Sequence, residues 1–488
     1  MHKSPLLVLL LLITLSGCYN KTESPQFCDV RQENAKEDSD YLYLRTILPD
    51  RPLTLLDIIE IANQLNLDLL VKKLDWTIQE EIASGETLKM LPSFIYSSWN
   101  SHRNNSTASS QLTSTTGALS PPLISSTQTD HHWDYTLTWN LLDFGLAYFR
   151  SRSEIDRAQV ARFQYEKVKQ NLVLDIYKSY WKAVSAKISS EHSKEVIALS
   201  QNVKITTQRE AKERLISSIQ GFQTEDQMLQ IQKRLIYLED AYFEAKAELA
   251  GLMGIPQTYC FELAPFELSE MPDEFDLCEM EDIALLNRPE LYGADFQGSI
   301  TANQARVELL QMFPSFSLFE GFHTDKNPFL LHSTWILVGC QMAWNLFSLP
   351  QHLVDTLAAR DRQYQAYISR LALTVGVISQ VNIAYWKYQE AFHQYNLQRE
   401  ITSVQRRLAD ATKKQFLYGL IGIVDVVKTE GDAVESETAL FGLYGDLQVA
   451  LEQINNAMGR PLLYNTIEND ALESDEIECD EIEYNEYE

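Results

Sequence analysis

The sequence has no hydrophobic run long enough to cross a bilayer as a helix. Its longest apolar stretch, residues 5–15, is shorter than the roughly 20 residues that a spanning helix needs. The mean hydropathy of the chain is −0.23, so apolar residues do not dominate its composition. These observations exclude a polytopic helical membrane protein. They do not exclude a transmembrane β-barrel, because its strands alternate apolar and polar residues and escape hydropathy averages.

Positive charge is also scarce. The 488 residues include 41 Lys and Arg against 68 Asp and Glu, which gives a net charge of −27. A chain this acidic is a poor partner for nucleic acid or for an anionic membrane surface. Hydrophobic residues make up 45% and charged residues 22%, which is typical of a folded protein rather than a disordered one.

Cysteine is rare, with six in the chain, and no Cys-x-x-Cys or Cys/His cluster has the spacing of a metal site. We therefore expect neither a metal nor another cofactor. Cys260 and Cys278 could pair in an exported chain, but their spacing alone leaves this open.

The N-terminus has the composition of an export signal. His2 and Lys3 precede an apolar segment that ends in Leu15-Ser16-Gly17-Cys18. This ending resembles the bacterial lipobox, which implies a lipoprotein signal peptide at 1–17, lipid attachment at Cys18 and a lipidated linker at 18–52. Tyr19 replaces the Asp that retains lipoproteins at the inner membrane, so we expect the outer membrane. The alternative is an ordinary signal peptide with a chance cysteine.

The chain repeats itself with an offset of 205 residues. Trp139-Asn140-Leu141 recurs as Trp344-Asn345-Leu346, and Tyr180-Trp181-Lys182 recurs as Tyr385-Trp386-Lys387. Upstream the offset is 222, so the first repeat has an insertion, which we place in a Ser- and Thr-rich loop at 102–130. We divide the chain into repeat one at 53–256, an equatorial linker at 257–276 and repeat two at 277–463. The tail at 464–488 is rich in acidic residues, and we expect it to be disordered.

Each repeat predicts very long helices. Residues 146–220 contain no Gly or Pro, and a helix of that length would extend about 110 Å. We place a turn at Gly221, then a return helix, and in repeat two a helix at 277–312 that is interrupted at Pro289. Ile401, Val404 and Leu408 form an apolar seam typical of a coiled coil. Helices this long must pack against one another.

A strand pattern separates the rising and descending helices. Residues 133–141 alternate between apolar side chains, with Trp133 at one end, and polar ones. We expect strands near 91–101, 132–143, 313–323 and 334–347, and strands of this length suit a tilted membrane crossing. Four strands cannot enclose a pore, and open edges are not tolerated in lipid, so a barrel needs several copies of the chain.

These features together resemble a known family. The matching motifs are Leu53-Thr54-Leu55, Asn287-Arg288-Pro289-Glu290-Leu291, the run from Trp139 to Gly145, and the run from Gly419 to Val427. The chain resembles the outer-membrane efflux proteins, the TolC-like family, and within it the lipoprotein branch that includes OprM. The resemblance implies an α+β membrane protein of tandem repeats, with long periplasmic coiled helices and four transmembrane β-strands per chain. A homotrimer would then complete a 12-stranded barrel.

The resemblance also implies a function. The chain would be the exit duct of a tripartite efflux system for small molecules, working with a periplasmic adaptor protein and an inner-membrane pump. It would be anchored in the outer membrane and extend into the periplasm. No catalytic residues are expected, because a duct breaks no bond. The pairs His131–His132 and Glu80–Glu81 fit turn and surface positions better than acid/base catalysis.

The resemblance assigns residues to the periplasmic end. Asp425 aligns with the first acidic position of the family's pore gate, and Lys428 stands where the second acidic residue is found. The alternative is that both side chains face solvent between helices. Gly221, Gly419 and Gly422 mark the helix tips that would face the adaptor.

Two other functions remain open. One is a TolC-like duct for type I secretion of proteins or peptides, although lipidation favours small molecules. The other, of a different class, is a lipid-anchored coiled-coil scaffold of the envelope that conducts nothing. The amphipathic strand at 133–141 argues against the scaffold, which has no use for such a strand.

Overall fold

The computed structural model describes residues 27–460, except 47, 113, 116, 260, 266–271, 273 and 274. The predicted signal peptide, Cys18, Cys260 and the acidic tail therefore lie outside the described residues. The helix α2 (Phe27–Arg45) precedes the repeats and contacts the body through the Tyr43 hydroxyl, which lies 2.6 Å from the Thr258 hydroxyl.

The two repeats have the same order of elements and nearly the same element lengths. Each repeat begins with a helix of 11 residues and a helix of 22 residues, which are followed by two long strands. A helix of about 70 residues and a helix of 36 residues complete the repeat. In repeat one the elements are α3 (Leu55–Leu65), α4 (Leu67–Leu88), β1 (Ser93–His102), β4 (Thr129–Asn140), α5 (Leu141–Lys212) and α6 (Ser218–Met253). In repeat two they are α7 (Leu277–Asn287), α8 (Pro289–Leu310), β5 (Ser315–Asp325), β6 (Thr334–Ala343), the short 3-10 helix η1 (Leu346–Ser348), α9 (Leu349–Leu417) and α10 (Ile423–Met458).

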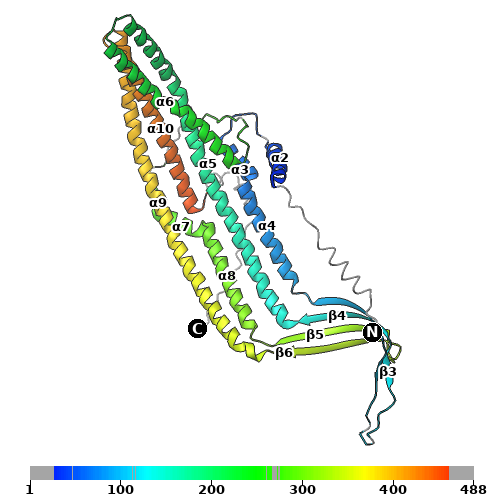
Figure 1. Ribbon diagram of the computed structural model, residues 1–488. Helices are drawn as coiled ribbons and strands as arrows, with labels where there is room; N and C mark the ends of the chain where they lie inside the picture. The colour runs from blue at the N-terminus through cyan, green and yellow to red at the C-terminus, as the bar shows by residue number, and fades with distance from the viewer. Residues whose placement is uncertain are drawn as a thin grey trace.

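The four long strands form one antiparallel sheet in the order β1-β4-β5-β6, as expected from the alternating pattern. The helices that extend from these strands follow the same order, because α4 packs on α5, α5 on α8, and α8 on α9 (Figure 1). The sheet and the helices thus form one continuous curved wall. β1 and β6 are the edge strands, and α4 and α9 are the helices at the same two edges.

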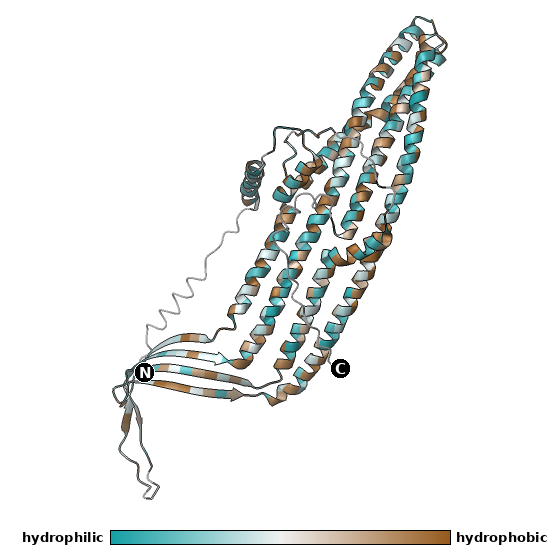
Figure 2. Ribbon diagram, turned by 180° about the vertical axis from the view of Figure 1, so that it is seen from behind, coloured by the Kyte–Doolittle hydropathy of each residue, from teal (hydrophilic) through white to brown (hydrophobic). Residues whose placement is uncertain are grey.

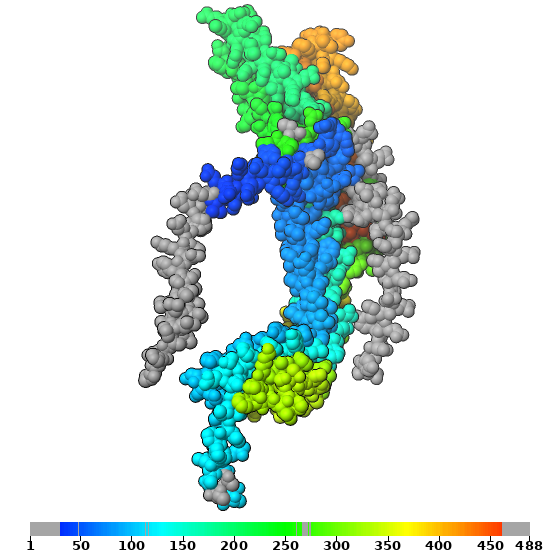
Figure 3. All heavy atoms as spheres, turned by 90° about the vertical axis from the view of Figure 1, so that its right-hand side faces the viewer, coloured from blue at the N-terminus to red at the C-terminus, as the bar shows by residue number. Residues whose placement is uncertain are grey.

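The half of the wall away from the sheet has a different set of helices. There α6 packs on α5 and α10 packs on both α5 and α9, so the two longest helices run through both halves. The molecule is elongated, with the α5–α6 and α9–α10 turns at one end (Figure 3). Shorter helices therefore flank each long one, since α8 and α6 both pack on α5, and α8 and α10 both pack on α9.

The largest core cluster is formed mainly by α3, α5 and α6 of repeat one and includes one buried residue of repeat two, Tyr444. Tyr444 of α10 is fully buried and meets the ring of Trp181 of α5 edge-on, with centroids 5.3 Å apart. A side chain at Gly445 would come within 3.1 Å of the Trp181 Cβ, so the glycine permits the close approach of α10 to α5. These contacts join repeat one to repeat two.

Short polar segments break the first helix pair of each repeat. Asn66 ends α3 and starts α4: its side-chain oxygen accepts the Leu69 N–H at 2.9 Å, and its amide donates to the Leu252 carbonyl. The sequence predicts a single helix from Pro52 to about Met90, and this prediction is wrong, because Asn66 ends one helix and caps the next. In repeat two the expected break at Pro289 is confirmed, and the buried Arg288 beside it donates to the Asn456 carbonyl at 2.9 Å.

The insertion in repeat one is more ordered than the expected loop. It contains a second, two-stranded sheet of β2 (Thr107–Ser109) and β3 (Leu123–Ser126), which projects beyond the main sheet (Figures 1 and 3). Asn327, in the β5–β6 connection, donates to the Ser125 carbonyl at 2.9 Å and ties this projection to repeat two.

Candidate channel gate and helix tips

The helix turn of repeat one lies at 213–217. Arg214 has a φ of 59°, and the N–H of Leu215 donates to the Glu210 carbonyl at 2.9 Å, which closes the end of α5. Ser217 then starts α6 with a capping box, since Ser217 accepts from a backbone N–H of the first turn and Gln220 accepts from the Ser217 N–H. The turn is therefore made without any glycine.

The turn expected at Gly221 is wrong, because Gly221 lies inside α6. The run at 224–229, which the sequence also suggests as the counterpart of the turn in repeat two, lies inside the same helix. Gly221 is buried, and a Cβ there would stand 3.0 Å from the Cβ of Ala211 near the end of α5. Its role in the structure is the close packing of the two helices just behind the turn.

The helix turn of repeat two agrees with its motif. Gly419 follows the end of α9 with a φ of 71°, a conformation that glycine adopts without strain. The Gly419 N–H donates to the Phe416 carbonyl at 2.8 Å, and Gly422 stands at the N-cap of α10. Both glycines lie at the same end of the molecule as the turn of repeat one (Figure 1).

Asp425 and Lys428 lie on the outward face of the first turns of α10. Val426 and Val427 between them are buried, and Val427 belongs to an apolar cluster with Met228 and Ile231 of α6. At 100° per residue, Asp425 and Lys428 both point away from that cluster, and both are exposed. Among the described residues neither side chain has an ion pair.

Ion pairs hold α10 between its neighbours a few turns from the tip. Arg406 of α9 donates to both oxygens of Glu437, one at 2.8 Å, and to Glu430 at 3.2 Å. The hydrogen bond to Glu437 raises the pKa of Arg406 above its ordinary value, despite the opposing effect of burial. On the other side, Arg234 of α6 donates to Glu435 at 2.6 Å. Both pairs link α10 to an adjacent helix.

The main sheet has one predominantly apolar face and one more polar face. Hydrophobic and hydrophilic residues are interspersed along the strands (Figure 2). Because cross-strand neighbours share a face, the strand pairing places most of the aromatic and aliphatic side chains on one face. Its apolar members are Phe94, Tyr96, Trp133, Tyr135, Leu137, Trp139, Phe316, Leu318, Phe322, Ile336, Val338 and Met342. On the opposite face His323 lies 2.7 Å from Asp134. In the single chain the sheet covers no core, because nearly all of β1 and β6 is exposed on both faces.

The two edge helices each carry an exposed apolar stripe. On α4 this stripe lies opposite the buried Leu69 and Ala83, and on α9 it lies opposite the buried Val377 and Val381. The α4 stripe consists of Val71, Leu74, Ile78 and Ile82, and the α9 stripe of Tyr364, Ile368, Leu371, Val375 and Trp386. Within the described residues one helical stretch, Leu346–Leu417, is apolar and long enough to span a membrane, but only 11% of its apolar window is buried in the single chain.

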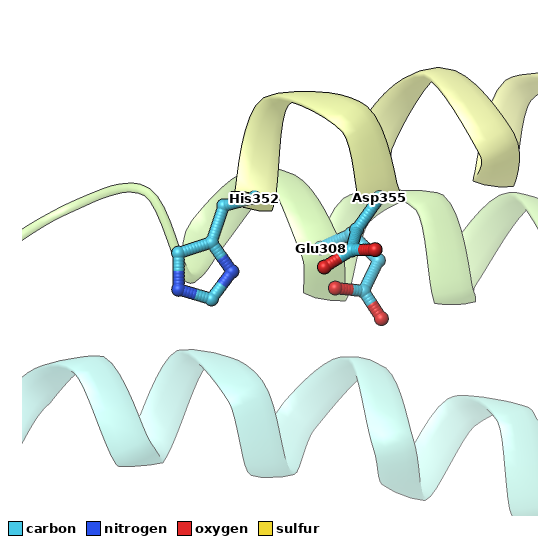
Figure 4. A group of neighbouring side chains, drawn as sticks. All are labelled: Glu308, His352 and Asp355. Atoms are coloured by element: carbon cyan, nitrogen blue, oxygen red, sulfur yellow. The ribbon is translucent and has the colours of Figure 1, made fainter. Parts of the chain in front are cut away.

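One group of neighbouring side chains was not predicted from the sequence. Glu308 of α8 lies beside His352 and Asp355 of α9, and one possible ligand atom from each lies within 4.8 Å of the others (Figure 4). The i, i+3 spacing of His352 and Asp355 is visible in the sequence. Their approach to Glu308 is not, because a β-hairpin lies between.

Comparisons with known proteins agree with this architecture. The sequence profile of outer membrane efflux proteins matches residues 282–460, which covers most of repeat two. A comparison with curated proteins finds no match.

Solved structures share the fold of both repeats. The CmeC outer membrane channel of Campylobacter jejuni is 13% identical with a TM-score of 0.69, over 86% of this chain and 89% of CmeC. VceC of Vibrio cholerae is 13% identical with a TM-score of 0.65, over 83% and 96%. MtrE of Neisseria gonorrhoeae, an outer membrane channel, is 15% identical with a TM-score of 0.63, over 83% and 89%. The chain therefore has the TolC-like fold of these outer membrane channels, and its residues 282–460 match the outer membrane efflux protein family.

Proposed function

We propose that three copies of this chain form an outer-membrane channel, the exit duct of a tripartite efflux system for small molecules. Each chain contributes four strands to a 12-stranded barrel, and the helices continue the barrel as a tunnel into the periplasm. The apolar face of the sheet contacts lipid and the polar face lines the lumen. The family match and the fold support a channel rather than an enzyme.

The observation that supports this proposal most strongly is that both edges of the main sheet are unpaired within the described residues. β1 and β6 end the sheet, and strand edges with unpaired backbone groups are not tolerated in lipid. The α4 and α9 stripes lie along the same two edges. When β6 and α9 of one copy pack on β1 and α4 of the next, the strand edges pair and the apolar stripes are covered at once. The contact then repeats around a ring that closes at three copies.

The half nearer the tips supports the same contact. There α6 and α9 are the helices at the two edges, and each has exposed apolar side chains at coiled-coil spacing. On α6 these are Phe222, Leu229, Ile236 and Phe243, and on α9 they are Leu397, Ile401, Val404 and Leu408. In the ring, α6 of one copy packs on α9 of the next, so the predicted seam at Ile401 joins two chains.

The periplasmic tips would carry the gate and the adaptor site. Three copies of Asp425 would form a ring that favours cations, with Lys428 weakening it or pairing with a neighbouring Asp425. The turns at 213–217 and at Gly419 and Gly422 expose apolar side chains such as Leu215 and Leu420, which suit contact with an adaptor protein. Lipid attachment at Cys18 would anchor the assembly.

The mass of the purified full-length protein in detergent tests the assembly. We expect three times the mass of one mature chain. Ile78, in the α4 stripe, is 51% exposed in the single chain, and burying such a side chain contributes roughly 1.5–3 kcal/mol. Ile78→Glu should therefore lower the temperature at which the trimer dissociates on an unboiled gel.

Thr77→Glu is the matched control, because it adds the same charge to an exposed position about a quarter turn from the stripe. Its trimers should dissociate as wild type does. A wild-type mass of one chain, or equal heat resistance of the two variants, would count against the proposed contact.

A further inference from the structure

We propose that Glu308, His352 and Asp355 form a binding site for a divalent transition-metal ion, with Zn²⁺ the best-fitting ion. The site lies where the β5–β6 hairpin joins the helices. Glu308 is in the last turn of α8, just before β5, and His352 and Asp355 are in the first two turns of α9, just after β6. The three side chains come from one chain, so this inference is independent of the proposed function.

The geometry of the three side chains suits a shared ion. Figure 4 shows the two carboxylates next to each other, with the imidazole ring beside them. One nitrogen and two oxygens lie within 4.8 Å of one another. Bonds of about 2.1 Å to Zn²⁺ would place tetrahedral ligand atoms about 3.4 Å apart. Small side-chain rotations are enough to close that difference, because all three side chains are only partly buried.

The side chains lack other partners among the residues that the structure describes. Neither carboxylate has an ion pair, although the two lie close enough to repel each other. The Nδ1 atom of His352 is buried and has no hydrogen-bond partner in the described part of the chain. A buried polar atom without a partner is costly, and a metal ion would satisfy it together with both carboxylates.

The types of ligand determine the class of ion. Mg²⁺ and Ca²⁺ prefer sites made of oxygen alone. An imidazole nitrogen with two carboxylate oxygens matches the donors that bind Zn²⁺, and three protein ligands leave a fourth position for water. Such an ion would clamp α8 to α9 at the base of the hairpin and hold its two strands at a fixed separation.

Metal content of the purified full-length protein tests the site directly. The protein is prepared without a polyhistidine tag, stripped with EDTA, and dialysed against micromolar Zn²⁺. We expect one Zn²⁺ per chain above the background of the acidic tail, which is the same in every variant. His352→Ala and Glu308→Gln should each weaken Zn²⁺ binding by at least about tenfold. An excess of Mg²⁺ or Ca²⁺ should not displace the ion.

His393→Ala is the matched control, because it removes an exposed histidine from the same helix and should leave Zn²⁺ binding unchanged. Zn²⁺ should also raise the melting temperature of wild type and of this control, but not of His352→Ala. If His352→Ala does not fold, the Zn²⁺ content of Glu308→Gln tests the site instead, because this substitution nearly preserves the shape of the side chain. Equal Zn²⁺ content in wild type and Glu308→Gln would overturn the proposal.

Discussion

At the scale of single residues, the start of α3 shows how one carboxylate organises a helix end. The Asp57 carboxylate accepts hydrogen bonds from the Thr54 N–H at 2.9 Å and from the Thr54 hydroxyl at 2.8 Å. The Arg51 guanidinium forms a bidentate ion pair with the same carboxylate. Burial favours the neutral acid, but these hydrogen bonds outweigh it and hold the pKa of Asp57 below its ordinary value. The ionised form therefore stabilises the fold.

Asp57→Asn should reduce stability in a pH-dependent way. Because the pKa of Asp57 is lower in the folded than in the unfolded state, its charge stabilises the fold above about pH 4, and this contribution is lost as the pH falls further. We expect a loss of about 1 kcal/mol at pH 7 that narrows towards pH 3. Chemical unfolding of wild type and variant at both pH values measures it. A difference that stays constant down to pH 3 would argue against this role of the charge.

Gly221 has a packing role that a larger side chain cannot fill. A Cβ at this position already meets the Ala211 Cβ at 3.0 Å, so Gly221→Leu should force α5 and α6 apart and cost about 1–3 kcal/mol. Gly251→Ala in the same helix meets nothing within 4 Å and should be neutral or stabilising. Thermal melts followed by circular dichroism compare the two. Equal melting temperatures would contradict the assignment.

At the scale of elements, α10 depends on ion pairs for its position near the tip. Arg406→Met removes the bidentate ion pair with Glu437 and the ion pair with Glu430. Because Arg406 is partly exposed, we expect the packing of α10 on α9 to lose about 1 kcal/mol of stability. Hydrogen exchange in the first turns of α10 should rise. Lys182→Met, which removes an exposed pair with Glu248, is the control and should have no such effect. Unchanged exchange in the Arg406→Met variant would show that packing alone holds the helix.

The long helices and strands were predictable because their signals are local. A stretch without Gly or Pro predicts α5, and the alternation of apolar and polar residues at 133–141 predicts β4. The internal sequence repeat then predicts α9 and β6 as their counterparts. The turn at 213–217 was missed because Arg214, not glycine, adopts the left-handed conformation. The capping box of Ser217 and Gln220 was the available signal.

The functional groups were harder to predict than the fold. Asp425 and Lys428 could be placed at a helix tip from their motif, but the surface they face depends on copies of the chain that one sequence does not position. Glu308 and His352 approach each other only after β5 and β6 pair, so no local pattern reveals their cluster.

At the scale of the whole molecule, a single chain is an incomplete wall. Its sheet has two open edges and its edge helices have uncovered apolar stripes, whereas the core at Trp181 and Tyr444 is complete. In the proposed trimer, neighbouring copies cover these edges and stripes. The same ring would enclose the lumen, which the described residues of one chain do not enclose by themselves.

Single-channel conductance in planar bilayers tests the duct most directly. We predict that inserted trimers pass a low, cation-preferring current, and that Asp425→Ala reduces the cation preference by removing the carboxylate ring. Asp226→Ala, which removes an exposed carboxylate near the tip of repeat one, should leave it unchanged. If the cation preference is the same in wild type and Asp425→Ala, the channel function would still hold, but Asp425 would not form the gate. Inserted trimers that pass no current, even with the Arg406→Met substitution that loosens α10, would contradict the account.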